Sequence, residues 1–356
     1  MHLSSVEVIP YALPFKRPYV TARGALERRE MVLLRVRDEE GVAGLGEAVP
    51  LSLRGGVTLT EVVRELEEWA ARQEDEGLSA PARCAVAVAR MDLLGRRAAD
   101  QSGGEDEAVP CNATLAAGGP EAVVADAEAW AAEGFTTFKL KLGAESARSV
   151  GMRRSSRTRG SGDVEMVRAV REALGPEVRI RVDANQAWDF ETAKVRLAEL
   201  EPYGIELAEQ PVGTLEELAE LAEATSIPLA ADESVASLDE AEEAAALGAC
   251  AYTGIKLSKV GGPEDALRIA DVLPAYITSA LDGPVGIAAA AQTALSLAET
   301  GHPERLHLAH GLATPRLFDS TIASAECELR NGMLHLPPGP GLGVEIDEDA
   351  LQAHRL

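Results

Sequence analysis

Short apolar runs alternate with helix-periodic stretches along the chain from about residue 110 onward. The pattern starts with CNATLAAG and PEAVVADAEAWAAEG, and it continues through TFKLKLG, VRIRVDANQAW, GIELAEQPV and IPLAADESV to LHLAHGL. A short bounded apolar run is typical of a buried strand, and apolar residues three and four apart are typical of a helix. Strand–helix alternation of this length predicts a parallel sheet wound by helices, and seven or eight units predict a (β/α)₈-type barrel.

The first hundred residues and the tail follow other patterns. REMVLLRVRDEEGVAGLGEAVP predicts a hairpin turning at DEEG. TLTEVVRELEEWAARQEDEG predicts a helix with a glycine stop, PARCAVAVARMDLLGRRAAD a second helix, and QSGGEDEAVP a linker. In the tail, ECELRNGMLHLP predicts a hairpin with an Asn-Gly turn, and GPGLGVEIDEDAL predicts extended chain. We expect an N-terminal α+β domain over 1–108, a barrel over 109–316, and a segment over 317–356 that returns to the first domain.

Polar side chains stand where successive apolar runs end. Asp183, Glu209 and Asp232 lie 26 and 23 residues apart, Lys256 follows after 24 residues and Ser279 after 23 more. This spacing suits one β/α unit for each step. Residues at equivalent strand ends converge on the carboxyl-terminal mouth of a barrel, where barrel enzymes have their active sites.

Three converging carboxylates repel one another in a partly dry cleft, and a hard divalent cation would neutralise them. Mg²⁺ takes oxygen ligands and keeps positions for water and substrate. The alternative is that each acid caps the helix after its strand, which accounts for one or two of the three. No Cys/His set competes for zinc, and His302, His307 and His310 are better explained as polar packing. The pattern therefore favours a metal site.

Lysines interrupt two apolar runs, Lys139 and Lys141 in TFKLKLG and Lys256 and Lys259 in GIKLSKVGG. Strand alternation alone would place such lysines on a solvated face. These lysines lie near the ends of apolar runs, as the three carboxylates do, and this shared position instead favours a place in the same site.

Composition narrows the class of protein. The 356 residues are 46% hydrophobic, enough for a large core, and the net charge of −24 disfavours nucleic acid and anionic membranes as partners. No apolar run approaches the roughly 20 residues of a membrane span, and the first residues lack a signal-peptide pattern. The four cysteines form no CxxC pair and are expected in the core of a cytoplasmic protein; they are Cys84, Cys111, Cys250 and Cys327.

Taken in order, these motifs resemble the enolase superfamily. The motifs are the Lys-x-Lys pair, VDAN, EQP, ADES and IKLSKVGG, and the resemblance covers nearly the whole chain. It implies an α+β capping domain over a (β/α)₇β barrel with Mg²⁺, or Mn²⁺ in its place, on Asp183, Glu209 and Asp232. Lysines on both sides place the chain in the muconate-lactonizing subgroup, where an enolate forms from a small carboxylate substrate.

The resemblance also implies residue roles. Lys141 is the expected base, Lys139 is the expected neighbour that lowers the pKa of Lys141, and Lys256 lies across the substrate. Asn185 and Ser279 are expected to contact the substrate.

Two stretches, TARG…RRE…GEAVPL and TSALDGPVG, are similar to o-succinylbenzoate synthases of menaquinone biosynthesis. The expected reaction is syn dehydration by a lyase. N-acylamino acid racemase, dipeptide epimerase and muconate cycloisomerase activities stay open, and a barrel that has lost its activity is disfavoured because no motif residue is missing. Assembly as a homo-oligomer is also left open. The Arg-rich segment 146–162 is interpreted as a solvated loop beside Lys141, with a substrate gate as the alternative.

Overall fold

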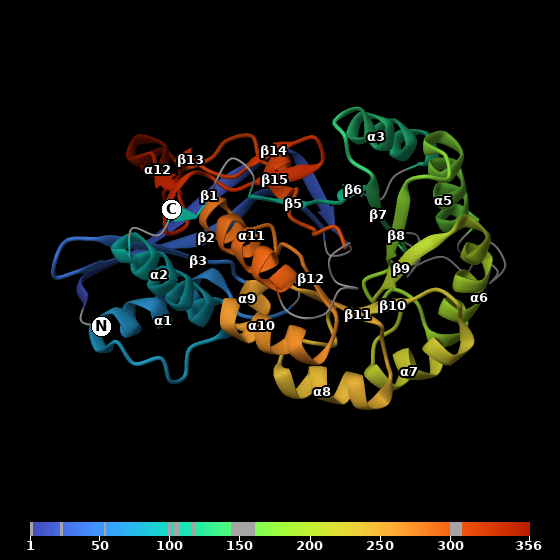
Figure 1. Ribbon diagram of the computed structural model, residues 1–356, viewed down its shortest axis with the longest axis horizontal. Coiled ribbons are helices and arrows are strands. Elements are labelled where there is room, and N and C mark those ends of the chain that lie inside the picture. The colour runs from blue at the N-terminus through green and yellow to red at the C-terminus, as the bar shows by residue number, and fades with distance from the viewer. Residues whose placement is uncertain are drawn as a thin grey trace.

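The computed structural model describes residues 3–21, 24–52, 55–98, 101–102, 107–115, 119–143, 161–299 and 308–356. Most of the segment 146–162, together with His302 and His307, lies outside these residues. Figure 1 shows a ring of strands and helices beside a second lobe, and both chain ends lie on that second lobe. The molecule therefore has the two parts that the change of pattern near residue 110 predicts.

Seven parallel strands run side by side in chain order around the ring. They are β6 (Ala113–Leu115), β7 (Thr137–Lys141), β8 (Arg179–Asp183), β9 (Ile205–Glu209), β10 (Leu229–Ala231), β11 (Tyr252–Ile255) and β12 (Ala275–Ile277). A final short segment closes the sheet, because His310 pairs in parallel with Cys111 and Gly311 pairs in parallel with Thr278. The chain thus forms a (β/α)₇β barrel, as expected.

Helices cover the outside of the barrel, as Figure 1 shows along the arc from α3 to α8. Their starts carry the capping signals that the sequence offers, such as Thr214 with Glu217 in a capping box at α7. They are α3 (Pro120–Ala132), α5 (Ser161–Leu174), α6 (Phe190–Leu200), α7 (Leu215–Ala224), α8 (Leu238–Leu247), α9 (Leu257–Val260), α10 (Pro263–Val272) and α11 (Pro284–Glu299), with 3₁₀ turns at Glu201–Tyr203 and Thr314–Leu317.

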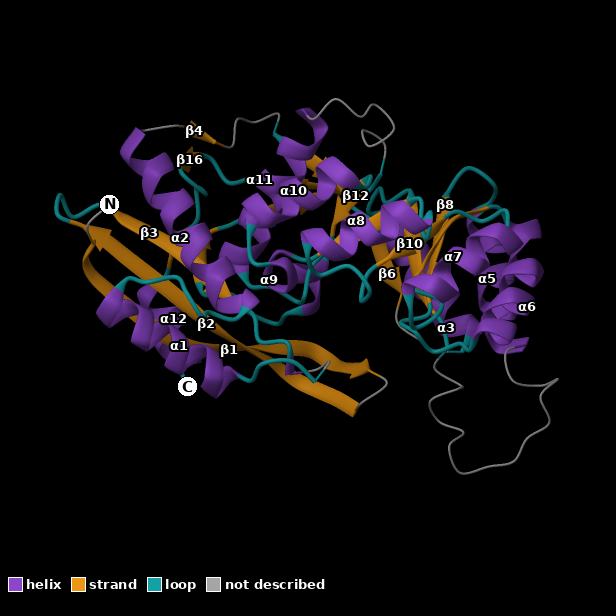
Figure 2. Ribbon diagram, turned by 90° about the horizontal axis from the view of Figure 1, so that it is seen from below, coloured by secondary structure: helices purple, strands orange, loops and turns teal. Residues whose placement is uncertain are grey.

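The second lobe is an antiparallel sheet covered by two helices, and its long strands extend beneath the barrel in Figure 2. The antiparallel pairing of the second and third strands of this sheet confirms the expected hairpin. The elements are β1 (Leu3–Thr21), β2 (Gly24–Asp38), β3 (Ala43–Ala48), α1 (Leu59–Arg72) and α2 (Ala80–Ala98). Helix α1 ends at Arg72, before the expected glycine stop, because Gln73 takes the left-handed conformation and donates its backbone N–H to Trp69.

The tail adds short strands and one helix. Asn331 and Gly332, both with positive φ, form the turn of the expected hairpin. The end of the chain is not wholly extended as predicted, because the Asp347 side chain accepts two backbone N–H groups and starts a helix. The elements of the tail are β13 (Ala323–Ala325), β14 (Glu328–Arg330), β15 (Met333–His335), β16 (Gly339–Pro340), β17 (Glu345–Ile346) and α12 (Glu348–His354). Two short strands that precede the barrel pair with it, β5 (Ala108–Pro110) with β15 and β4 (Gln101–Ser102) with β16.

The tail packs on the second lobe. Arg355 pairs with Tyr11 on β1, and Phe318 pairs with Phe15 while their rings stack 5.0 Å apart. The buried Arg35 on β2 donates to Glu348 of α12 at 2.5 Å. These contacts tie the chain's two ends together, and the domain boundaries at 108 and 316 stay a prediction.

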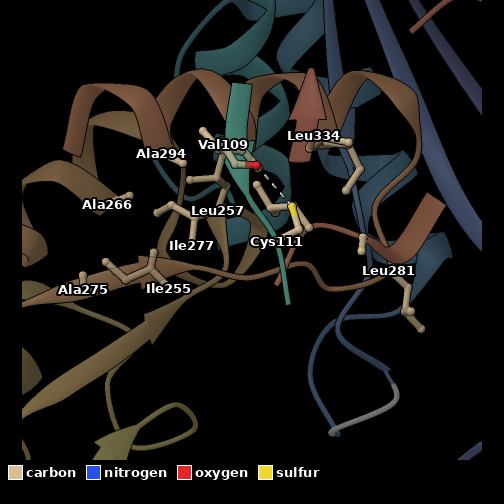
Figure 3. Close-up of a cluster of buried hydrophobic side chains, with 14 of the residues drawn as sticks. Val109, Cys111, Ile255, Leu257, Ala266, Ala275, Ile277, Leu281, Ala294 and Leu334 are labelled. Atoms are coloured by element: carbon tan, nitrogen blue, oxygen red, sulfur yellow. Dashed lines mark hydrogen bonds between the residues drawn. The ribbon is translucent and has the colours of Figure 1, made fainter. Parts of the chain in front are cut away.

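One buried apolar cluster joins the barrel to the tail. Figure 3 shows Cys111 beside Val109, near Leu257 and Ile277 of the barrel and Leu334 of β15. The Cys111 thiol donates to the Val109 carbonyl at 3.7 Å, and burial raises its pKa to about 12. All four cysteines are free, three of them buried, in agreement with their expected packing role. Among the described residues, no helix has the length and apolarity to cross a membrane.

Candidate active site

The strand-end residues meet at one mouth of the barrel. Lys141 ends β7, Asp183 ends β8 and Glu209 ends β9, and these three lie level because Lys141 pairs with Asp183 and Asp183 pairs with Glu209. Asp232 follows β10 and Lys256 follows β11 directly. The three carboxylates are at most 1% exposed. The structure therefore brings the three carboxylates to one mouth of the barrel with Lys141 and Lys256.

The order of the strands places the two lysines across the mouth from each other. β11 is the fourth strand along from β7 in a ring closed by the segment at His310. Lys141 and Lys256 therefore stand on opposite sides, and the carboxylates of β8, β9 and β10 fill the arc between them.

Lys139 holds two of the carboxylates together. It lies two residues before Lys141 on the same face of β7, and it is 6% exposed. Its ammonium donates to both oxygens of Glu209, at 3.1 and 3.0 Å, and lies 3.4 Å from Asp183. Its contacts are those of a bridge between two strand-end acids.

Lys141 and Asn185 form the next contact along the mouth. Lys141 is ion-paired with Asp183 and donates to the Asn185 side-chain oxygen at 2.9 Å. Asn185 has φ of 46°, a left-handed conformation that asparagine tolerates, and its amide donates to Glu233 at 3.1 Å. Asn185 therefore lies beside the expected base, and its role toward a substrate stays a prediction.

Asp232 is held by two lysines. Lys256 donates to both of its carboxylate oxygens, and Lys259 donates to one of them at 3.0 Å and to the Asp232 carbonyl. Lys259 does not continue a strand, because Lys256 is the N-cap of the single-turn helix α9 and Lys259 lies on that turn. The helical turn is what directs both ammonium groups onto one acid.

Neighbouring carboxylates change the pKa of Lys141, the expected base. Burial alone would lower the pKa of Lys141, but the charge of Asp183, with Tyr19 and Glu209, raises it above its usual value. Burial alone would raise the pKa of Asp183, but Lys141 and Lys139 hold it below its usual range. In this arrangement the contact with Asp183 outweighs the neighbouring ammonium of Lys139, and the expected lowering of the pKa of Lys141 beside a bound cation stays a prediction.

The three carboxylates are the candidate ligands of a hard cation. Among the described residues, no group of three or more His, Cys, Asp or Glu side chains is arranged as a metal shell, because the carboxylates are turned onto lysines. Three buried carboxylates from adjacent strands are nevertheless oxygen donors of the kind that Mg²⁺ takes, and the charge of Asp232 acts on Asp183. The donor atoms fit the ion in chemistry and come from neighbouring strand ends, and their role as ligands stays a prediction.

The hydroxyl of Ser279 is engaged within its own loop. It donates to Asp282 at 2.6 Å and accepts the backbone N–H groups of Leu281 and Asp282 and the hydroxyl of Thr314. These contacts shape the loop after β12. A contact between Ser279 and a substrate stays a prediction.

Sequence reasoning missed two polar residues that support the carboxylates. Tyr276 on β12 donates to Glu209 at 2.6 Å, and the Gln210 side-chain oxygen accepts the backbone N–H of Asp232 at 2.8 Å. Tyr276 is hidden in an apolar run, whereas Gln210 directly follows a strand-end acid and could have been found. His310 is buried, accepts the Ile277 N–H, and has its pKa lowered to about 3, which agrees with a packing role.

Two protein-family descriptions match this chain. Residues 4–74 match the mandelate racemase/muconate lactonizing enzyme N-terminal domain, and residues 122–350 match the enolase C-terminal domain-like family. The first match falls on the antiparallel sheet and α1, and the second on the barrel after β6 and on most of the tail.

Individual relatives differ in their reactions. An o-succinylbenzoate synthase from Thermobifida fusca is 36% identical over 69% of this chain and 70% of its own length. Muconate cycloisomerase 1 from Acinetobacter baylyi is 28% identical over 99% of each chain. The crystal structure of a dipeptide epimerase from Enterococcus faecalis, complexed with Mg and L-Leu-L-Tyr, is 26% identical, with a TM-score of 0.84 over 97% of this chain and 100% of that one.

Proposed function

Because this chain belongs to the enolase superfamily, with the mandelate racemase/muconate lactonizing enzyme type of N-terminal domain, we propose that it removes a proton alpha to a carboxylate. The substrate is a small carboxylate, and the enolate formed is stabilised at the barrel mouth. The reaction we favour is the syn dehydration of a cyclohexadiene carboxylate to o-succinylbenzoate.

One observation carries the proposal: two lysines on opposed strands flank three buried carboxylates. A substrate carboxylate directed at the acidic arc would present its alpha carbon between Lys141 and Lys256. A base must be within reach of the proton that it removes, and this placement meets that requirement from either face.

The carboxylates would be the site of a cofactor. When bound by Asp183, Glu209 and Asp232, Mg²⁺ would replace the lysines as their counter-charge and take up negative charge from the substrate carboxylate. With Asp183 holding the ion, Lys141 would no longer be paired with that carboxylate. As a neutral amine it can accept the alpha proton, and Asn185 at 2.9 Å holds its nitrogen in place.

In the dehydration, the C–H electron pair becomes the new ring double bond and the C–O bond breaks on the same face. Lys141 returns the proton to the departing hydroxide, so that water leaves and the lysine is again neutral. Lys256 stays an ammonium on the other face and stabilises the enolate by its charge. One acid/base group is sufficient for this reaction.

Two features support dehydration over the alternatives. The Thermobifida fusca relative is a synthase of this kind and is 36% identical. The stretch LAHGLATPRLF at the closing segment also lacks an acidic Asp-x-Asp pair, which the resemblance leads us to expect in a dipeptide epimerase, where it would receive the substrate's amino group. Racemisation or epimerisation stays the alternative, because the opposed lysines suit a proton taken from one face and returned on the other.

A panel of substrates tests the proposal. The protein with Mg²⁺ is incubated with the cyclohexadiene precursor of o-succinylbenzoate, N-succinyl amino acids, L-Ala-L-Glu and cis,cis-muconate. We expect fast turnover of the precursor. Preferred turnover of another member would replace the dehydration with that reaction, and no turnover of any member, with no alpha-proton exchange, would reject proton abstraction.

A further inference from the structure

A buried polar column lies inside the barrel beneath the acidic arc. Arg181 on β8 and Tyr276 on β12 are both fully buried and are among the largest such side chains in the described chain. Arg181 lies two residues before Asp183, so its side chain shares that residue's inward face. Its guanidinium lies 5.0 Å from the centre of the Tyr276 ring.

Other strands fix both ends of the column. Arg181 donates to Glu206 at 2.5 Å and to the Ala309 carbonyl, beside the closing segment, at 2.7 Å. The Tyr276 ring packs in a small apolar cluster with Leu207, Ala230 and Leu308. The ring is therefore held from both sides, and its hydroxyl has a defined place in the barrel.

That hydroxyl meets one oxygen of Glu209. The Tyr276 hydroxyl donates to Oε2 at 2.6 Å, and Lys139 also donates to Oε2, at 3.0 Å. The other oxygen, Oε1, receives Lys139 at 3.1 Å. If Glu209 bound a cation at the mouth, its contact with Lys139 would have to break. The hydrogen bond from Tyr276 comes from the barrel interior and could remain.

We propose that Tyr276 is a positioning residue that fixes Oε2 of Glu209 from inside the barrel and so presents Oε1 to a divalent cation at the mouth. This inference rests on the proposed function, because it assigns Glu209 as a ligand. Without the Tyr276 hydroxyl, Lys139 would be the remaining one of these two donors to the Glu209 carboxylate. The carboxylate could then rotate instead of keeping one orientation. Groups that orient metal ligands from behind typically account for about 10–100-fold in metal affinity.

The test is the affinity of the whole protein for Mn²⁺ alone, measured by electron paramagnetic resonance without substrate. Tyr276→Phe keeps the ring and removes the hydroxyl. We expect it to weaken Mn²⁺ binding about tenfold or more. Turnover lost at low Mg²⁺ should be recovered at high Mg²⁺, which a merely structural defect would not do.

Tyr252→Phe is the matched control, because Tyr252 packs against the same apolar cluster from β11. We expect its Mn²⁺ affinity to equal that of the wild type, and circular dichroism shows whether both variants fold. Should Tyr276→Phe fold poorly, Arg181→Lys, which loosens the ring's support but keeps the hydroxyl, should weaken Mn²⁺ binding by a smaller factor. Unchanged affinity in folded Tyr276→Phe, or in Arg181→Lys where that variant stands in for it, would overturn the positioning role alone, whereas no Mn²⁺ binding by the wild type would overturn the metal site itself.

Discussion

At the scale of single residues, the mouth of the barrel is a set of buried ion pairs. Asp183, Glu209 and Asp232 each contact at least one lysine. Removing one partner of a buried pair leaves the other charge uncompensated, so the members of the set depend on one another. The same contacts keep Lys141 protonated, and any base function requires that its contact with Asp183 be broken.

The carboxylates can be tested one at a time. We expect Asp183→Asn, Glu209→Gln and Asp232→Asn each to reduce kcat by more than about 10²-fold, because each removes a hard oxygen ligand but little volume. The measurement is turnover at saturating Mg²⁺, with circular dichroism as the check on folding. Asp239→Asn, on the exposed first turn of α8, is the control and should behave as the wild type. Wild-type turnover in any of the three would remove that residue from the ligand set.

Chelation tests the ion itself. Treatment with EDTA should abolish turnover, and added Mg²⁺ should restore it, because the proposed enolate depends on a Lewis acid. Full activity in the EDTA-treated protein would mean that the lysines stabilise the enolate without a cation.

Much of the site could be predicted at this scale. The same position, at the carboxyl end of a strand, is taken by Asp183, Glu209, Asp232 and Lys256. In a regular barrel these positions lie close together. The partners of each lysine could not be predicted, because they depend on which strands are adjacent and on the rotamer of each side chain. Tyr276 was missed because one tyrosine in an apolar run carries no sign of its partner.

At the scale of elements, the start of α11 shows how the two lobes meet. Glu47, at the end of β3, accepts the Gly283 N–H at 2.6 Å and the Tyr11 hydroxyl at 2.8 Å. A carboxylate at the start of a helix accepts hydrogen bonds from the free backbone N–H groups and interacts favourably with the positive end of the helix dipole. The stretches GEAVP and LDGPVG, both similar to o-succinylbenzoate synthases, are thus two sides of one contact between lobes.

This contact requires a glycine. A Cβ atom at Gly283 would lie 2.3 Å from the Tyr11 hydroxyl and 2.7 Å from a Glu47 oxygen. We expect Gly283→Ala to lower the free energy of unfolding by about 1–3 kcal/mol in urea titrations, because the lobes must separate to admit a methyl group. Gly119→Ala is the control, since Gly119 also precedes a helix-starting proline but has no atom of the described residues within 4 Å of its Cβ position. Equal effects of the two substitutions would refute the close contact.

Element types were predictable here and element ends were less so. The periodicity of the first hundred residues located α1 and α2, but α1 ends at Arg72 because the next residue adopts a left-handed cap. Lys259 lies on a helical turn because β11 ends at Ile255 and Lys256 then caps α9. Both ends are set by single backbone conformations that no periodicity encodes.

At the scale of the whole molecule, a buried charge cluster joins the capping lobe to the barrel. Burial and the charge of Asp282 raise the pKa of Glu47 to about 7, although hydrogen bonds from Tyr11 and Gly283 lower it. Arg29 lies close enough to act on the same group, and burial lowers its own pKa to about 10. We therefore expect the contact between the lobes to respond to pH near neutrality.

The pKa of Glu47 in the folded and unfolded protein decides whether a rise in pH stabilises or destabilises the fold. Unfolded Glu47 loses its proton near its usual pKa of 4.5, and folded Glu47 keeps it until about 7. The stability that Glu47 contributes is thus fully present below pH 4.5 and is lost as the pH rises through 7. In Glu47→Gln, we expect the fall in unfolding free energy between pH 5 and 7.5 to shrink by about 1–3 kcal/mol.

Urea titrations at the two pH values measure this effect. Glu67→Gln, at an exposed position of α1, is the control and should keep the wild-type difference. A Glu47→Gln variant with the full wild-type pH dependence would show that Glu47 does not titrate in this range.

The central claim is that Lys141 is the base of a dehydration at the barrel mouth, with Lys256 as an electrostatic partner. The most direct test is the formation of o-succinylbenzoate from its cyclohexadiene precursor in D₂O, followed by NMR for the wild type, Lys141→Ala and Lys256→Ala. We expect rapid product formation by the wild type, none by Lys141→Ala, and a rate about 10²–10³-fold lower in Lys256→Ala. The account would be contradicted if no o-succinylbenzoate formed while both enantiomers of an N-succinyl amino acid exchanged their alpha proton rapidly, each lysine variant losing exchange on one of them.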